Sequence, residues 1–298
     1  MTHLLQLLVS GVSLGAVYAL LALGFVVVFR ATEVVNFAHP ALLMVGAYFT
    51  ARFRTVDELP FPVAVLLGVG VAVLVALAVQ FFLVRRMSGR SVIAVSIMTI
   101  GVDVVIQTEI TRRLGVDILP MGDPWQDGVV HLDGLTIPQT RIAALVLSVA
   151  LLAAFFAWFR YSDWGVAMRA SAENPETAAL MGVRRARVAA LAWAIAGALA
   201  ALAGLSLTTF PAPGLEPATS AVALRAFPAA IIGGLDSTAG AVVGGLVVGV
   251  TEALAQGYAS ELSFLGLGFH TVMPYLVMVI VLLVRPTGLF GTRELHRV

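Results

Sequence analysis

Long apolar runs separated by short polar stretches dominate this chain. Runs of about 20 apolar residues recur from end to end, the length that an α-helix needs to cross the hydrocarbon core of a bilayer. Most of them lack the polar positions at a 3.6-residue period that a soluble helix shows. The pattern predicts an all-α integral membrane protein, a polytopic helical bundle of about eight spans. The predicted segments are residues 4–29, 37–50, 61–84, 92–110, 142–159, 188–210, 226–254 and 265–284.

Two of these segments are irregular. Residues 37–50 are few for a complete span, and residues 226–254 are many and are interrupted by GGLDSTAGAVVGG. Irregular backbone persists at membrane depth only where protein or a cavity shields it, so broken or re-entrant helices are expected at both places. For residues 37–50 a crossing and a re-entrant path both remain open. The re-entrant path, with the amino terminus inside, is favoured.

Arginine placement predicts the orientation, because cytoplasmic loops carry an excess of basic residues. RRMSGR at residues 85–90 and the stretch at 160–187 are rich in arginine and are expected in the cytoplasm, as is the carboxyl end. The intervening loop, residues 111–141, is then external. It contains four aspartates, Asp117, Asp123, Asp127 and Asp133. The whole chain, residues 1–298, is expected to form one transmembrane domain.

Composition excludes several kinds of chemistry. All 18 basic residues are arginine, so the chain has neither the lysine of a phosphate-binding P-loop nor one that could form a Schiff base. It has no cysteine for disulfides, iron–sulfur clusters or thiol catalysis. GVSLG at residues 11–15 matches a nucleophile-elbow pattern but lies inside an apolar run, which favours helix packing. No catalytic set, metal site or nucleic-acid partner is indicated, and any ATP used must be bound by another chain.

The polar stretch at residues 160–187 contains start and stop signals for a short helix. Asn174 is a suitable N-cap, Pro175 fits the first helical position and Glu176 adds a favourable charge to the first turn. Gly182 can supply the left-handed residue that ends the helix. A helix this short, residues 175–181, is unstable alone in water, so a partner surface is expected to hold it. The alternative is an ordinary loop whose arginines only fix the topology.

These residues also resemble a known family. Glu176-Thr177-Ala178, with Gly182 four residues further on, is similar to the E-A-A-x-x-x-G loop of ABC importer permeases. RASAENPETAALMGVRRARVAALAWAIAGALAALAG resembles, more closely, the permeases of branched-chain amino-acid (Leu/Ile/Val) importers. GVSLGAVYALLALGFVVVFRATEVVNFAHPALLMVGAY, LRAFPAAIIGGLDSTAGAVVGGLVVGVTEAL and RPTGLFG agree with that family in order. Pro40 stands where the family usually has glycine, so a helix is expected to start beside His39. The I-x-L-P that continues the general importer loop is absent here.

The resemblance implies a transmembrane subunit of an ATP-driven importer, a multi-pass protein of the bacterial inner (plasma) membrane. It implies a heterodimer with a second homologous permease, two cytoplasmic ABC ATPases that carry ATP and Mg²⁺, and an external solute-binding protein. No cofactor is expected on this chain, whose other contact is membrane lipid. The residues expected to couple to the ATPase are Glu173, Asn174, Pro175, Glu176, Thr177, Ala178, Ala179, Leu180, Met181, Gly182, Arg184 and Arg185.

Branched-chain amino acids lead as cargo, with urea and short amides, carried by sister groups, as the alternative. A rival of another class is a secondary transporter driven by an ion gradient. Asp103 and Glu252 would then relay protons or sodium ions. Glu252 is otherwise expected near the end of its helix, at the membrane interface.

Polar residues inside the spans are candidates for the translocation path, because a charge at a helix centre costs about 2.5–3.5 kcal/mol on insertion scales. Thr99, Asp103 and Gln107 recur at one-turn spacing and predict a polar stripe, either on the path or as an interhelical hydrogen-bond clamp. Asn36 and His39 flank the short segment, where helix N–H groups could face a carboxylate. Asp236 and Ser237 lie at the break in residues 226–254.

Overall fold

A computed structural model describes residues 2–87, 89–115, 118–122, 124, 128–132, 135–209, 214–261, 266 and 268–292. Almost all regular structure in these residues is helical, and six of the described helices are long and apolar enough to cross a membrane. The chain is therefore an all-α polytopic membrane protein, as predicted. The four aspartates of the predicted external loop, Asp117, Asp123, Asp127 and Asp133, lie outside the described residues.

Each predicted apolar segment corresponds to one helix or to a pair of helices. The long helices are α1 (Thr2–Thr32), α3 (Phe61–Val79), α4 (Val92–Leu114), α5 (Gln139–Tyr161), α8 (Arg185–Thr209) and α11 (Thr238–Gly257). The shorter ones are α2 (His39–Thr55), α6 (Asp163–Glu173), α7 (Pro175–Leu180), α9 (Thr219–Leu224), α10 (Ala226–Gly233) and α12 (Met273–Val284). A π-helical turn, Gln80–Val84, and a 3-10 turn, Arg85–Met87, extend α3.

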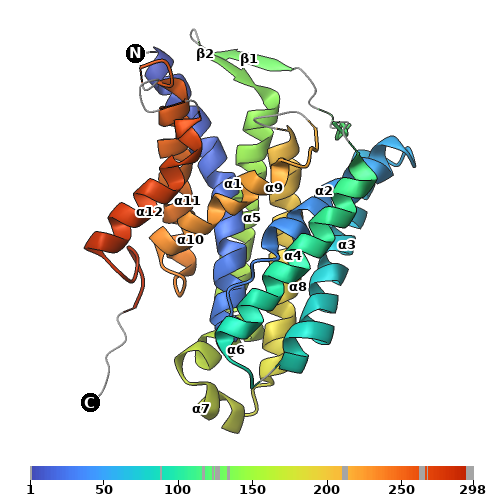
Figure 1. Ribbon diagram of the computed structural model, residues 1–298, viewed down its shortest axis with the longest axis vertical. Coiled ribbons are helices and arrows are strands. Elements are labelled where there is room, and N and C mark those ends of the chain that lie inside the picture. The colour runs from blue at the N-terminus through green and yellow to red at the C-terminus, as the bar shows by residue number, and fades with distance from the viewer. Residues whose placement is uncertain are drawn as a thin grey trace.

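The helices form two groups that meet along α1, α5 and α8. Figure 1 shows α10, α11 and α12 on one side of α1, and α2, α3 and α4 on the other, around α8. The β1–β2 hairpin, Val129–Leu132 paired with Leu135–Pro138, lies at one end of the bundle, and α6 and α7 lie at the opposite end. These are called the hairpin end and the α7 end below.

Glycine brings α1 and α11 into close contact. A Cβ placed on Gly11 would come within 2.7 Å of the Val250 Cα, and one on Gly15 within 2.9 Å of the Leu246 Cα. Gly249 of α11 approaches the same two turns from the other side. Close approach of helix backbones through small residues is a common mode of association in membranes. GVSLG is thus a packing face, as predicted, and not a nucleophile elbow.

The path of α2 corrects the favoured re-entrant interpretation. The first half of α1 lies beside the start of α5, where the Ser13 hydroxyl donates to the Arg141 carbonyl at 2.9 Å, and its far end contacts α6. The chain then returns toward the hairpin end, where Arg54 in the last turn of α2 donates to the Gly122 carbonyl at 3.1 Å. The amino terminus therefore lies at the hairpin end (Figure 1), and residues 33–55 lead the chain back to that end, although α2 is not among the six candidate spans.

The second irregular segment is broken as predicted, and the carboxyl-terminal stretch covers the break. Helix α10 ends at Gly233, Gly234 takes a left-handed φ of 102°, and Ser237 caps α11. The N–H groups of Leu289 and Phe290 donate to the carbonyls of Ile232 and Gly233 at 2.8 and 3.1 Å. These carbonyls belong to the last turn of α10 and would otherwise lack partners.

The hairpin was not predicted, although the sequence contains a signal for it. VVHL and LTIP, two short runs of high β propensity, are separated by Asp-Gly, a strong indicator of a tight hairpin turn. Strands of four residues are too short to stand out among apolar runs of about 20 residues.

Candidate functional site

Helix α6 is firmly attached to the rest of the α7 end. The Ser162 side chain caps it by accepting the Gly165 N–H at 3.1 Å. Trp164 is buried, stacks on Trp158 with ring centroids 5.0 Å apart, and donates its indole N–H to the Val188 carbonyl at 3.3 Å. Since Val188 lies in the first turns of α8, α6 is tied to two long helices. It therefore provides a rigid base for α7.

The local prediction for α7 is confirmed. The Asn174 side chain accepts the Thr177 N–H at 2.9 Å, Pro175 is the first helical residue, and Gly182 has a φ of +88°. The Val183 N–H donates to the Ala178 carbonyl at 3.0 Å, which closes the end of the helix. The helix ends at Leu180, one residue before the predicted end.

The outer surface of α7 is both apolar and charged. Leu180 is 87% exposed and Met181 81%, whereas Ala178 faces inward and is buried. The charged neighbours of this tip are also exposed, and none makes an ion pair with another described residue. They are Glu173, Glu176, Arg184, Arg185 and Arg187. A tip that exposes two large apolar side chains amid unpaired charges has the composition of a contact surface.

The polar stripe of α4 holds the start of α2. The Thr99 hydroxyl accepts the Phe37 N–H at 2.9 Å, and one oxygen of Asp103 accepts the Ala41 N–H at 3.0 Å. Gln107 donates to the other Asp103 oxygen at 2.7 Å. Backbone N–H groups in the first turn of a helix lack partners within that helix, and here α4 supplies them. The stripe thus forms the interhelical clamp that was one of the two predicted roles. Its role on a path stays a prediction.

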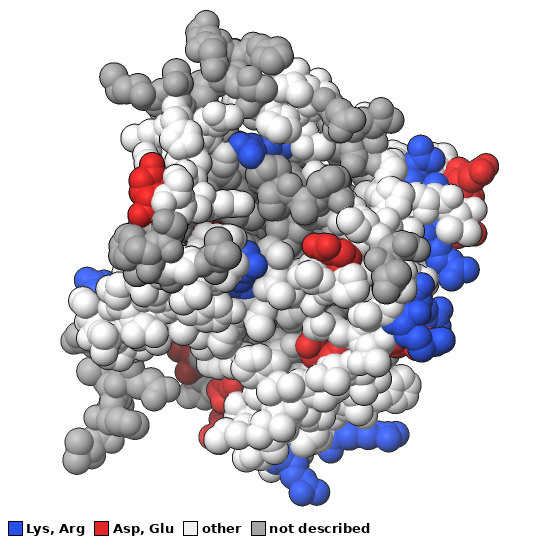
Figure 2. Space-filling view, turned by 45° about the horizontal axis from the view of Figure 1, so that its top comes forward, with Lys and Arg blue, Asp and Glu red and all other residues white. Residues whose placement is uncertain are grey.

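The same stripe borders an open hollow on the outer face of α4. The hollow is a shallow, largely open depression of about 520 Å³, and its lining residues all belong to α4: Asp103, Val104, Gln107, Thr108, Thr111 and Arg112. Figure 2 shows that most of the surface in view is uncharged, and that scattered acidic and basic groups interrupt it. Asp103 is a half-buried carboxylate close to the middle of a membrane-crossing helix, where contact with lipid is costly.

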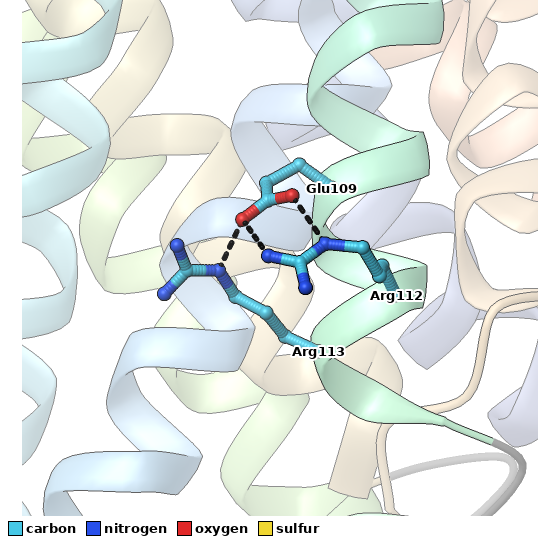
Figure 3. A network of polar contacts seen from close by, with 3 residues as sticks. All are labelled: Glu109, Arg112 and Arg113. Atoms are coloured by element: carbon cyan, nitrogen blue, oxygen red, sulfur yellow. Dashed lines mark hydrogen bonds and ion pairs between the residues drawn. The ribbon is translucent and has the colours of Figure 1, made fainter.

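A second carboxylate, on the next turns of α4, is neutralised by arginine. Glu109 accepts from Arg112 at 2.8 and 2.9 Å and from Arg113 at 2.6 Å, as Figure 3 shows. All three side chains are well exposed near the hairpin end of α4, so the network contributes little to stability. It does, however, engage the guanidinium of Arg112, the arginine that lines the hollow.

Asn36 and His39 are sealed inside the protein. Both side chains are completely buried, and the His39 ring lies against Phe25 with ring centroids 4.6 Å apart. The N–H groups at the start of α2 are already used by Thr99, Asp103 and the Asn36 side chain, which accepts the Ala38 N–H at 3.0 Å. Pro40 has no N–H and sits in the first turn, as predicted. The helix start therefore has no free N–H groups to offer a carboxylate in this conformation.

The structure separates Asp236 and Ser237 from the other predicted path residues. Ser237 accepts the Gly240 N–H at 3.0 Å as the cap of α11, and Asp236 accepts the Thr292 N–H at 2.8 Å. Asp236 is also within electrostatic range of Arg30, whose helix end contacts α6. Neither residue lines the hollow: Asp236 fastens the carboxyl-terminal stretch, and Ser237 caps α11.

A buried polar centre between α1, α9, α10 and α11 was not predicted. Glu252 is only 3% exposed; it accepts the Tyr18 hydroxyl at 2.7 Å and pairs with Arg225 at 2.5 Å. Glu252 lies five residues before the end of α11, near the end of its helix as expected, but its side chain points into the protein. Arg225 is the only arginine between residues 188 and 284, inside a long apolar stretch, and that isolation was an available signal.

The fold, the six candidate spans and the carboxylates inside them define a polytopic helical membrane protein built around polar centres. The family model for "Branched-chain amino acid transport system / permease component" matches residues 7–284. The permease protein LivH of the high-affinity branched-chain amino acid transport system of Escherichia coli K12 is 33% identical over 99% of this chain and 98% of its own. The corresponding permease protein BraD of Pseudomonas aeruginosa is 28% identical over 99% and 98%.

The chain belongs to this family of transport permeases and is a multi-pass protein of the inner membrane. Among solved structures, the chain is similar to PsaBC from Streptococcus pneumoniae in complex with Fab, over 96% of its own residues and 93% of the matched PsaBC chain. Its TM-score is 0.49 and its sequence identity 11%, too distant a likeness to say anything about function.

Proposed function

We propose that this chain is the transmembrane permease subunit of an ATP-driven importer of branched-chain amino acids, and that α7 couples it to a separate ATPase. The observation that carries the proposal is the exposed apolar tip of α7 on an anchored base. Leu180 and Met181 project from a helix that is capped at both ends, and α6 beneath it is tied to α5 and α8. A movement imposed on the tip would therefore be passed to two long helices.

The charges around the tip support a protein partner of mixed charge. Glu173 and Glu176 precede the tip, and Arg184, Arg185 and Arg187 follow it, all without ion pairs among the described residues. A groove of an ATPase that offers apolar contacts and charges of both signs would fit this surface. ATP and Mg²⁺ then belong to two such ATPase subunits in the cytoplasm, in keeping with the lack of lysine.

The remaining partners follow from the proposed assembly. A second, homologous permease completes the passage as a heterodimer, and an external solute-binding protein delivers the cargo at the hairpin end. The names of the E. coli and P. aeruginosa relatives, which are similar over nearly their full length, support branched-chain amino acids as the cargo. Urea or short amides are the alternative cargo.

Co-purification of the ATPase with single variants of the permease tests the coupling role. Leu180→Glu and Met181→Glu alter exposed side chains and should leave the fold intact, yet each should weaken ATPase binding at least about tenfold, because each places an unpaired charge in the apolar part of the proposed contact. Val166→Glu on α6 is the matched control, since Val166 is 57% exposed at the same end. Equal retention of the ATPase by all three variants would contradict the proposal.

The rival reading, a secondary transporter, is tested by reconstitution. The chain alone in liposomes, without ATP or partners, should show no uptake of leucine under a proton or sodium gradient. The contacts of Glu252 also speak against a relay, because both of its oxygens have close partners in Arg225 and Tyr18. Gradient-driven uptake by the isolated chain would contradict the proposal that this chain is a subunit of an ATP-driven importer.

A further inference from the structure

The hollow on α4 contains a carboxyl group, Asp103, that no cation among the described residues balances. Among the described residues Asp103 makes no ion pair, and its two contacts are the neutral Ala41 N–H and the Gln107 amide. Arg112 also lines the hollow, but its guanidinium is bound by Glu109 through two hydrogen bonds (Figure 3). The arginine of the hollow therefore pairs with Glu109, and it lies nine residues along α4 from Asp103.

Asp103 is held in place and can still accept further hydrogen bonds. The start of α2 fixes one carboxylate oxygen and Gln107 the other, while each ionised oxygen has a second lone pair available. The carboxylate is half-buried and borders the open hollow of about 520 Å³. A fixed, incompletely paired carboxylate beside a space of this size can receive a small cation.

We infer that the hollow is part of the passage and that Asp103 is the contact for the ammonium group of an amino acid in transit. The inference rests on the proposed function and names the group of the cargo that is recognised. A primary ammonium carries three donors and one positive charge, which match a carboxylate with free lone pairs. Gln107, Thr108 and Thr111 add polar groups along one side of α4, whereas Val104 offers an apolar contact for the side chain of the cargo.

Cysteine accessibility in the full chain tests this inference without ATP or the ATPase. Because the chain has no cysteine, Thr108→Cys and Val104→Cys each introduce a single thiol into the hollow. Membranes containing the variants are treated with a cationic or an anionic methanethiosulfonate, and the remaining thiol on this chain is counted with a maleimide mass tag. We expect both positions to react, and the cationic reagent to react faster.

Leu74→Cys on α3 is the matched control, because Leu74 is exposed within a helix whose sequence, residues 61–79, has no polar side chain. It should react with neither reagent. In Asp103→Asn the ratio of cationic to anionic rate should fall by about tenfold, since one charge next to the thiol is lost. Asparagine still offers an oxygen to the Ala41 N–H, so α2 stays capped, and Asp103→Glu, which keeps the charge, should keep the ratio.

Protection by ligand identifies the chemical group. Leucine should slow the reaction at Thr108→Cys, whereas the 2-hydroxy acid of the same carbon skeleton, which lacks the ammonium, should not. If Thr108→Cys and Val104→Cys are as unreactive as Leu74→Cys, the hollow is not part of the passage. An unchanged rate ratio in Asp103→Asn, or equal effects of leucine and the hydroxy acid, would overturn the ammonium contact. None of these results depends on whether an ATPase binds α7, so the two proposals can fail separately.

Discussion

Helices α3 and α4 both pack on α2 and both expose most of their length, yet their outer faces differ in kind. The most apolar stretches of α3 and α4 are 28% and 22% buried, so neither helix is a core helix. The outer face of α3 presents Leu66, Leu74 and Phe81 and has no charged residue before Arg85. The outer face of α4 presents Ile97 and Val104 beside Asp103, Gln107 and Thr108.

The difference indicates what covers each helix in the membrane. An outer face such as that of α3 is stable against lipid, whereas a carboxylate at the middle of a helix is not, and requires water or protein. A residue that is exposed in the isolated chain can therefore face lipid, or it can face water or another subunit. The polar residues on a helix distinguish these two cases. By this criterion α3 faces lipid, and α4 faces either the passage or a second subunit.

The largest expected effect comes from placing the same charge on both helices. Leu74→Asp puts a carboxylate on the lipid face of α3 and should lower the yield of inserted protein, because the change costs about 2.5–3.5 kcal/mol at the centre of a span. Val104→Asp on α4 should be tolerated much better. The amount of folded protein in membranes, measured by fluorescence size-exclusion chromatography, tests this. Equal losses for both variants would mean that α4 also faces lipid.

A somewhat smaller effect is expected when Asp103 loses its carboxylate. Asp103→Leu leaves the Ala41 N–H without a partner, which costs about 1–3 kcal/mol for a buried donor. It should lower the thermal midpoint of the purified protein and impair uptake, while ATPase binding at α7 persists. Asp103→Asn retains an acceptor and should keep the thermal midpoint. A Leu variant as stable as the Asn variant would show that the contact to α2 is unimportant.

Gln107 should have a milder role, because it supports Asp103 from one side only. Gln107→Leu removes one hydrogen bond to the carboxylate and should cost about 0.5–1.5 kcal/mol, near the value for a single hydrogen bond. Leu66→Gln on α3 is the reverse exchange. The thermal midpoints of Gln107→Leu and Leu66→Gln, measured in the same detergent, are compared with that of the unchanged chain. If Gln107→Leu lowers the thermal midpoint more than Asp103→Leu does, then Asp103 is not the centre of the stripe.

Sequence reasoning identified the elements whose cause is local. The caps of α7 at Asn174 and Gly182, the break after Gly233 and the periodicity of Thr99, Asp103 and Gln107 all depend on neighbours within a few residues, and each is present in the structure. The predictions that failed depend on contacts between distant segments. Glu252 is buried because Tyr18 and Arg225, 234 and 27 residues away in sequence, come to it.

The amino-terminal orientation failed for the same reason. Whether residues 37–50 cross or re-enter depends on where the N–H groups of α2 find acceptors, and those acceptors are on α4, 62 residues further on. The periodicity of α4 shows a polar stripe but gives no sign of which helix the stripe serves. The role of each predicted path residue thus depends on the residue that it contacts, and only the tertiary structure shows which residue that is.

The smallest and most discriminating change adds one methyl group to each helix. Gly70 of α3 and Gly101 of α4 both lie within helices, and a Cβ on either meets no atom within 4 Å. Alanine at either position should therefore stabilise the isolated chain by about 0.5–1 kcal/mol through helix propensity.

In the assembled transporter the two variants should differ in their uptake rates. Gly70→Ala should keep its uptake rate because its methyl points into lipid. Gly101→Ala should lower the rate slightly, by an amount equivalent to less than about 0.5 kcal/mol, because Gly101 is exposed on α4 about one turn from Val104, which borders the proposed passage. Initial rates of leucine uptake, normalised to the amount of permease, measure this. Identical rates for the two variants would remove the distinction between α3 and α4 at the two positions where an added methyl meets no other described segment.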